Sequence, residues 1–285
     1  MKLMPSKRAS SIIHERNIRY PSEIYVRDIA MSLGALVRER ELQGCEARLV
    51  RKGDIGIISV NSLIPEEGRK RFAIAHEIGH FILHKGTQLI LCSEEDMHVW
   101  KESKIQEMEA NEFAASLLMP YEFIIKFIRI GQPTLDMISE IAKAFRTTLT
   151  ATTFRYVSIS KEPCALVVSK DGIIRWYKKS DSFNFHVKVG EKLSFDTYAF
   201  DYFDGVNLPE EPDSVPARAW LAGEIDEEAE LFEQSLSLGS YGVVLSLLWI
   251  CDDVKTKYRR YDDEPEEPEF DLTNPFTPDG KRWQW

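Results

Sequence analysis

One short helical segment constrains this chain more than any other part of it. Residues 69–84 read RKRFAIAHEIGHFILH, and apolar side chains recur around much of the helix that this pattern predicts. Such a helix is expected to be buried, yet it carries His76, Glu77 and His80. Burying two imidazoles and a carboxylate is costly unless a partner such as a metal ion satisfies them. A metal site is therefore favoured over the alternative, a solvated helix face.

The spacing of these residues predicts a particular chemistry. His76 and His80 are four residues apart, so both imidazoles lie on one face of a helix and can reach the same cation. A catalytic zinc site needs three protein ligands and an open position for water, whose pKa the metal lowers to about 7. Glu77 lies beside the histidines, where its carboxylate can take the proton of that water as it attacks a peptide carbonyl. The pattern predicts a zinc metallopeptidase with Glu77 as general base.

The third ligand is expected from the next helix along the chain. Glu107 and Asn111 share a face there, so Glu107 can bind the metal while Asn111 hydrogen-bonds the second nitrogen of a ligand histidine. Glu109 is the next candidate for this ligand. His84 continues the four-residue spacing but lies further round its helix. The metzincin spacing would place a ligand at Gly86, which excludes that class.

Two parts of the chemistry are left open by the sequence. Histidine and glutamate ligands accept several divalent metals, so manganese is an alternative to zinc. The group that would stabilise the tetrahedral oxyanion has four candidates, each with a core or surface role as its simpler interpretation: His84, His98, Arg71 and Tyr121. The metal alone can also polarise the carbonyl.

Periodicity and turn residues predict mainly helices in the first part of the chain and strands in the second. The first part is expected to hold a helix within residues 21–43, a hairpin from Ala47–Arg51 to Ile55–Val60, helices over 104–119 and 121–130, and two short helices in 134–157 with Thr134 as N-cap. The second part is expected to hold a hairpin turning at Lys170-Asp171-Gly172 and strands over 217–222, 230–238 and 242–250.

The expected fold class is α+β, in four parts. These are a peptidase domain over 1–132, a helix-turn-helix-like segment over 133–160, a smaller β-rich domain over 161–252 and an acidic, proline-rich tail over 253–285, expected to be extended or disordered. Trp176, Trp220 and Trp249 are expected to pack in the core of the β-rich domain.

Composition excludes several classes of protein. No run reaches the roughly 18 consecutive apolar residues of a membrane-spanning helix, and the first residues lack the apolar core of a secretion signal, so a cytoplasmic protein without a membrane partner is expected. The four cysteines form no CxxC pair and are expected to be reduced thiols. A formal charge of −10 argues against broad binding to nucleic acid. No particular oligomeric state is indicated.

Two sequence blocks resemble the ImmA/IrrE family of zinc peptidases. They are RFAIAHEIGH at residues 71–80 and EMEANEFAASLLMP at residues 107–120, and the likeness extends over roughly 20–160. The resemblance implies a zincin-like metallopeptidase domain with a helical extension, with His76 and His80 as ligands. It also implies Glu107 as third ligand and Glu77 as base. Members of the family cleave helix-turn-helix transcriptional repressors and so derepress stress-response or mobile-element genes, which implies such a repressor as the protein substrate.

Two functions without catalysis are the alternatives. A DNA-binding regulator could use residues 134–157, but that segment offers only Lys143, Arg146 and Arg155 to a nucleic acid, so direct binding is not expected. A non-catalytic protein could instead bind a repressor without cutting it, as an antitoxin-type or sensor component would. The presence of Glu77 argues against this second alternative, because a binding module has no need of that base.

Overall fold

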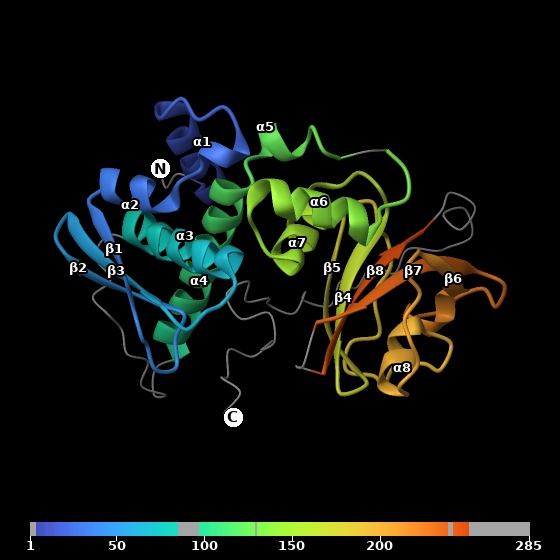
Figure 1. Ribbon diagram of the computed structural model, residues 1–285. Coiled ribbons are helices and arrows are strands. Elements are labelled where there is room, and N and C mark those ends of the chain that lie inside the picture. Colours follow the sequence, from blue (N-terminus) through green and yellow to red (C-terminus); the bar gives the residue numbers. More distant parts are fainter. Residues whose placement is uncertain (1–3, 85–96, 129, 239–241, 251–285) are drawn as a thin grey trace. The chain divides into compact units, whose positions relative to one another are not determined.

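A computed structural model describes the backbone of residues 4–84, 97–128, 130–238 and 242–250, and in the helix that begins at Met97 it describes side chains from Ile105 onward (Figure 1). These residues form two compact units. The first comprises the described residues up to Phe127 together with Ile141–Ala151, and the second comprises Ile128–Glu140 and the described residues from Thr152 onward. Eight α-helices and two sheets occur within these ranges, which confirms the predicted α+β class.

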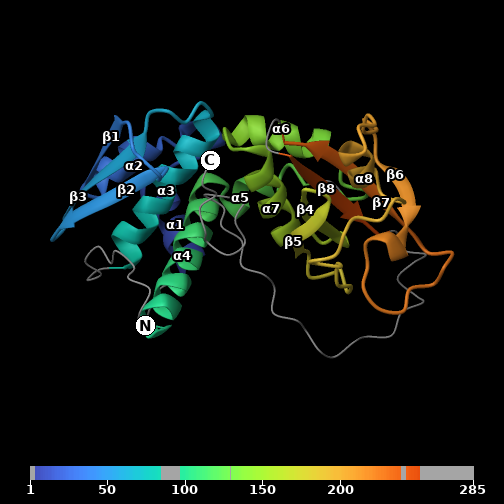
Figure 2. The same ribbon diagram turned by 90° about the horizontal axis from the view of Figure 1, so that it is seen from below.

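The first unit is a three-stranded sheet with helices packed on it. Its elements are α1 (Pro5–Glu15), η1 (Pro21–Glu23), α2 (Val26–Ser32), β1 (Ala35–Arg40), β2 (Ala47–Lys52), β3 (Ile55–Asn61), α3 (Glu67–Leu83), α4 (Met97–Leu118) and α5 (Tyr121–Ile124). The strand order is β1-β3-β2, with β1 parallel and β2 antiparallel to β3, so the predicted β2–β3 hairpin is confirmed. Helix α3 lies between the sheet and α4 (Figure 2).

A close approach of α3 and α4 fixes their relative position. A Cβ atom added to Gly79 would lie 3.1 Å from the Cα atom of Ala110 and 3.2 Å from its carbonyl oxygen. Only a glycine lets the two backbones come this near without displacement. Since Ala110 lies within one turn of Glu107 and Asn111, this approach brings those side chains of α4 to the histidine face of α3.

The single helix predicted within residues 21–43 is wrong. The chain forms a short 3₁₀ turn, then the seven-residue helix α2, then strand β1. Gly34 has a φ of 98°, and a Cβ atom there would lie 2.6 Å from the carbonyl oxygen of Asp54, so the chain leaves the helix at this point. Parallel pairing with β3 then places Leu36 in a strand, although its spacing from the preceding apolar residues is helical.

Two helices differ from their predicted bounds, and a third was not predicted. Helix α4 begins at Met97 rather than near residue 104, and α1 was not predicted at all. Helix α5 ends at Ile124, whereas a helix to Ile130 was expected. Phe123 and Ile124 are buried, but Ile130 is 99% exposed, so the later apolar residues do not form a buried helical face.

The two short helices predicted in residues 134–157 are confirmed as α6 (Leu135–Phe145) and α7 (Leu149–Ile159). Thr134 caps α6, because its hydroxyl oxygen accepts a hydrogen bond from the backbone N–H of Met137 at 3.2 Å. The apolar face of α6 is buried, including Ile138 and Ile141. This face therefore contributes to packing.

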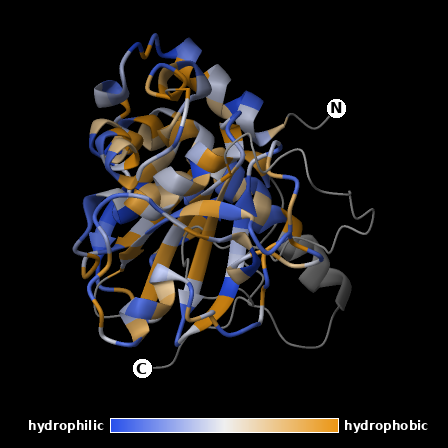
Figure 3. Ribbon diagram, turned by 90° about the vertical axis from the view of Figure 1, so that its right-hand side faces the viewer, coloured by the Kyte–Doolittle hydropathy of each residue, from blue (hydrophilic) through white to orange (hydrophobic). Residues whose placement is uncertain are grey.

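The second unit is an antiparallel five-stranded sheet. Its elements are β4 (Cys164–Lys170), β5 (Ile173–Lys179), α8 (Tyr198–Phe203), β6 (Asp213–Pro216), η2 (Ala217–Ala219), β7 (Glu230–Ser237) and β8 (Val243–Trp249), and the strand order is β5-β4-β8-β7-β6. The predicted β4–β5 hairpin is confirmed, with Asp171 and Gly172 both at positive φ in its turn. Figure 3 shows apolar residues concentrated along the central strands.

The core of the second unit corrects one prediction and confirms another. Residues 217–222 do not form a strand: a 3₁₀ turn follows β6, and the side chains of Ala217 and Trp220 are buried from it. Trp176 and Trp220 are fully buried, as predicted, whereas Trp249 is partly buried. The predicted disordered tail lies outside the described residues. No helix in the described ranges is long and apolar enough to cross a membrane.

Candidate metal centre

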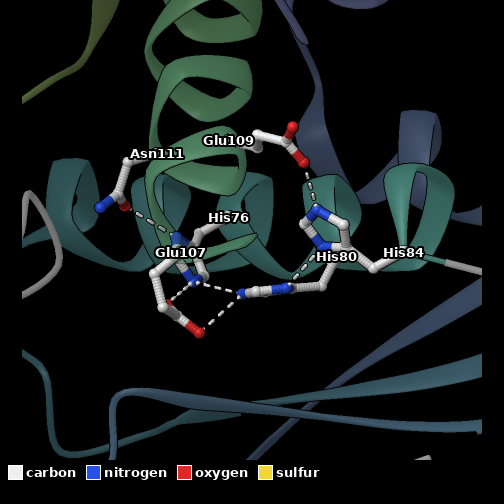
Figure 4. Close-up of polar contacts among 6 residues, drawn as sticks. All are labelled: His76, His80, His84, Glu107, Glu109 and Asn111. Atoms are coloured by element: carbon white, nitrogen blue, oxygen red, sulfur yellow. Dashed lines mark hydrogen bonds and ion pairs between the residues drawn. The ribbon is translucent and has the colours of Figure 1, made fainter. Parts of the chain in front are cut away.

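Helix α3 presents two histidine side chains to α4 (Figure 4). His76 is buried and His80 is partly buried, and their Nε2 atoms lie 2.9 Å apart. The four-residue spacing places them one turn apart on the same face of the helix. Both imidazoles therefore direct one nitrogen to a common point.

Glu107 of α4 completes this group. One carboxylate oxygen lies 3.1 Å from Nε2 of His76 and the other lies 3.2 Å from Nε2 of His80. Burial alone would raise the pKa of Glu107, but the adjacent imidazoles of His76 and His80, when protonated, outweigh burial and hold the pKa well below its usual range. The carboxyl group is therefore ionised at neutral pH.

Asn111 orients the first histidine. Its amide oxygen lies 2.8 Å from Nδ1 of His76. Since a carbonyl oxygen can only accept, Nδ1 carries the proton and donates it. The lone pair of Nε2 in His76 consequently faces His80 and Glu107.

The donor set fits a divalent cation. Around a tetrahedral zinc with bonds of about 2.1 Å, neighbouring ligand atoms lie roughly 3.4 Å apart. The three observed separations of 2.9, 3.1 and 3.2 Å are close to this value. Two imidazole lone pairs and a carboxylate directed at one point repel one another without a positive charge between them. His76, His80 and Glu107 form the one group of metal-ligating side chains found among the described residues.

The carboxyl group of Glu77 has a raised pKa. Burial raises its pKa, and the negative charge of Glu107 adds to this effect. The two histidines and a hydrogen bond from the backbone of Leu49 on β2 act in the opposite direction. A raised pKa makes a carboxylate a stronger base, which suits it to accept a proton.

The other candidates from the sequence lie outside the donor group. Glu109 interacts with His84, at 2.9 Å between Oε2 and Nε2, and Nδ1 of His84 lies 3.0 Å from Nδ1 of His80. Arg71 is buried and donates to the carbonyl oxygen of Ile24, and Tyr121 is exposed on α5. The side chain of His98 lies outside the described residues.

Sequence reasoning missed two features of this region. The first is the close approach at Gly79, for which a glycine in a buried helix was the only signal. The second is the contact of Glu109 with His84. The spacing of His80 and His84 placed these two on neighbouring helical turns, but no local pattern paired His84 with an acid 25 residues away.

Comparisons with known proteins agree with the geometry. Residues 30–156 match the family model of peptidase M78, described as the IrrE N-terminal-like domain. A solved structure named Mycobacterium tuberculosis transcriptional regulator has a similar fold, with a TM-score of 0.58 and 16% sequence identity, over 86% of this chain and 75% of that one. No curated protein matches the sequence. Residues 30–156 of this chain therefore match the IrrE N-terminal-like domain, in agreement with the resemblance of its two sequence blocks.

Proposed function

We propose that this chain is a zinc-dependent metallopeptidase with His76, His80 and Glu107 as metal ligands and Glu77 as general base. The observation that carries the proposal is the convergence of two imidazole nitrogens and a carboxylate on one point of α3 and α4. This convergence occurs in a domain of a peptidase family and directly beside a carboxyl group that suits proton transfer. Manganese is the alternative metal, because the same ligands accept it.

Glu77 and Asn111 have separate roles in the proposed reaction. When bound, the cation supplies the positive charge that acidifies water and polarises a peptide carbonyl. Glu77 accepts a proton from the water as the water oxygen attacks the carbonyl carbon. It then returns a proton to the peptide nitrogen as the carbon–nitrogen bond breaks. Asn111 keeps the proton of His76 on Nδ1, so that Nε2 remains a ligand.

Strand β2 is the proposed binding edge for the substrate. It lies at the edge of the three-stranded sheet, and the backbone of Leu49 on this strand is hydrogen-bonded to Glu77. An edge strand offers unpaired backbone groups to an extended peptide. A substrate segment paired with β2 would pass close to the base and the donor group.

We further propose that the substrate is a helix-turn-helix transcriptional repressor, cleaved to derepress stress-response or mobile-element genes. The family resemblance supports this, since its members cleave such repressors, and the similar solved structure is named a transcriptional regulator. Direct DNA binding by this chain has less support: Arg146 donates to the carbonyl oxygens of Ser22 and Ile24, and the apolar face of α6 is buried.

The test requires a helix-turn-helix repressor as substrate, sought first among the genes that neighbour the gene for this chain. Purified full-length protein with zinc or manganese is incubated with that repressor, and the intact masses of the products are measured. A single cut that is absent from Glu77→Gln and from a chelated sample is the expected result. Binding of the repressor without a cut, under either metal, would overturn the peptidase in favour of a non-catalytic repressor-binding protein.

A further inference from the structure

A chain of hydrogen bonds leads away from the donor group on the side of His80. Nδ1 of His80 lies 3.0 Å from Nδ1 of His84, and Nε2 of His84 lies 2.9 Å from a carboxylate oxygen of Glu109 (Figure 4). The side chain of His84 is 3% exposed and that of Glu109 is 21% exposed. These contacts therefore form in a region largely shielded from water.

The direction of each hydrogen bond in this chain follows from the acceptor at its far end, the carboxylate of Glu109. The carboxylate of Glu109 can only accept, so Nε2 of His84 carries a proton. In a neutral imidazole the other nitrogen is then an acceptor, so Nδ1 of His84 accepts a hydrogen bond from the Nδ1–H group of His80. With its proton on Nδ1, His80 presents the bare lone pair of Nε2 to His76 and Glu107.

The backbone around His84 is also anchored. Its N–H donates to the carbonyl oxygen of His80 at 3.2 Å, and its own carbonyl oxygen accepts from Arg51 of β2 at 3.4 Å. The guanidinium of Arg51 also donates to the carbonyl oxygen of Phe81 and stacks over its ring. Strand β2 thus anchors the C-terminal end of α3, where His84 is located.

We propose that His84 and Glu109 are positioning residues that fix the tautomer and orientation of His80 for metal binding, an inference that rests on the proposed metal site. They do for His80 what Asn111 does for His76. The two arrangements differ in their ends, since the His76 side ends in a neutral amide and the His80 side ends in a carboxylate. A charged end strengthens the hydrogen bond to the ligand and holds it more firmly.

A direct role for His84 as a metal ligand has less support. Its Nδ1 atom faces Nδ1 of His80, on the opposite side of that ring from Nε2. Its Nε2 atom is held by Glu109. Both nitrogens of His84 therefore already have partners, and neither is directed at the donor group.

The first test measures zinc affinity. Full-length Glu109→Leu and His84→Phe are compared with wild type by competition with a chromophoric chelator, with Glu112→Leu as the matched control from the exposed face of α4. Both variants are expected to bind zinc about 10- to 100-fold more weakly. Glu109→Gln and His84→Gln keep an acceptor oxygen, so their affinity should be closer to that of wild type. The control should match wild type.

Two further measurements separate positioning from folding. If the metal-free variants unfold at the wild-type temperature while zinc affinity falls, the role is positioning; unchanged zinc affinity would overturn the inference. In zinc-loaded wild type, long-range ¹H–¹⁵N spectra should show His80 protonated at Nδ1 and His84 at Nε2. The opposite tautomers would overturn the inference even if the variants do not fold.

Failure of the inference can be told apart from failure of the proposed function. Wild type that binds zinc and cuts its substrate, with variants that do the same at equal affinity, would overturn only the roles of His84 and Glu109. Wild type that binds no divalent metal would overturn the proposed function and this inference with it.

Discussion

The two units each hold a carboxyl group among polar partners, and the two sets of partners differ in kind. In the second unit, Glu233 is fully buried and accepts hydrogen bonds from the backbone N–H groups of Tyr198 and Ala199, the indole of Trp220 and the hydroxyl of Ser235. In the first unit, Glu107 lies against two imidazole nitrogens that are themselves directed at each other.

The difference separates a polar cluster that is complete in itself from one whose donor atoms fit an added cation. Every partner of Glu233 is a donor and the carboxyl group is an acceptor, so the cluster is complete without an added group. Around Glu107, two imidazole nitrogens and the carboxylate are directed at one point, an arrangement that a positive charge among them would stabilise. Burial raises the pKa of Glu233, and its hydrogen bonds oppose this shift. Burial of a carboxyl group therefore does not by itself identify a functional site.

The largest expected effect is the loss of catalysis in Glu77→Gln. Removing the proposed general base should lower peptide cleavage by roughly 10²- to 10⁴-fold while zinc affinity stays the same, because Glu77 is outside the donor group. Rates are measured on the repressor substrate, with zinc content determined in parallel. Cleavage at the wild-type rate would show that another group takes the proton.

The next largest effect is a loss of stability when Glu233 is replaced. Glu233→Ala leaves buried donors without an acceptor, so the second unit should lose about 3 kcal/mol or more of its free energy of unfolding. Peptide-resolved hydrogen exchange across β7, β8 and α8 measures this loss, with the exposed Glu227→Ala as control. Zinc affinity should be unchanged. A stability equal to that of wild type would mean that the cluster is not structural.

Removal of the metal should lower the stability of the first unit, which contains the donor group. At a free zinc concentration of 100 times the dissociation constant, bound metal stabilises a folded protein by about 2.7 kcal/mol. A chelator should therefore reduce hydrogen-exchange protection in α3 and α4 and leave β7 and β8 unchanged. Equal loss of protection in both units would remove the contrast between the two clusters.

The smallest expected effect tests how the metal cluster is assembled. In Gly79→Ala the new methyl group would meet the backbone of Ala110, and overpacking of this kind costs about 1–3 kcal/mol. Helix propensity offsets up to about 1 kcal/mol of that cost. A net loss of roughly 1 kcal/mol and weaker zinc binding are expected in chemical denaturation and chelator competition. A more stable variant with unchanged zinc binding would refute the close approach of the helices.

Local patterns in the sequence predicted the elements whose cause is local. The buried helix α3 and the two hairpins follow from apolar periodicity and from turn residues such as Gly53 and Gly172. The prediction of a continuous helix through Gly34 was wrong. The positive φ of this glycine and the pairing of β1 with β3 both depend on the rest of the domain.

The candidate site was predictable to a similar degree. His76 and His80 share a face by spacing alone, and the structure brings Glu107 and Asn111 to them as expected. The contact between His84 and Glu109 depends on the register of α3 against α4, which no short pattern encodes. The roles of these residues as ligands and base, and the division of the chain into four parts, remain predictions.

The most direct test of the central claim is the metal content and coordination of the purified full-length protein. After equilibration with zinc and removal of the excess, elemental analysis should find one zinc per chain. X-ray absorption should find two nitrogen ligands at about 2.0–2.1 Å and oxygen at about 2.0–2.2 Å. Zinc content should fall to background when His76 and His80 are both replaced by alanine. Zinc that stays bound in that double variant, or a wild type that binds none, would contradict the claim.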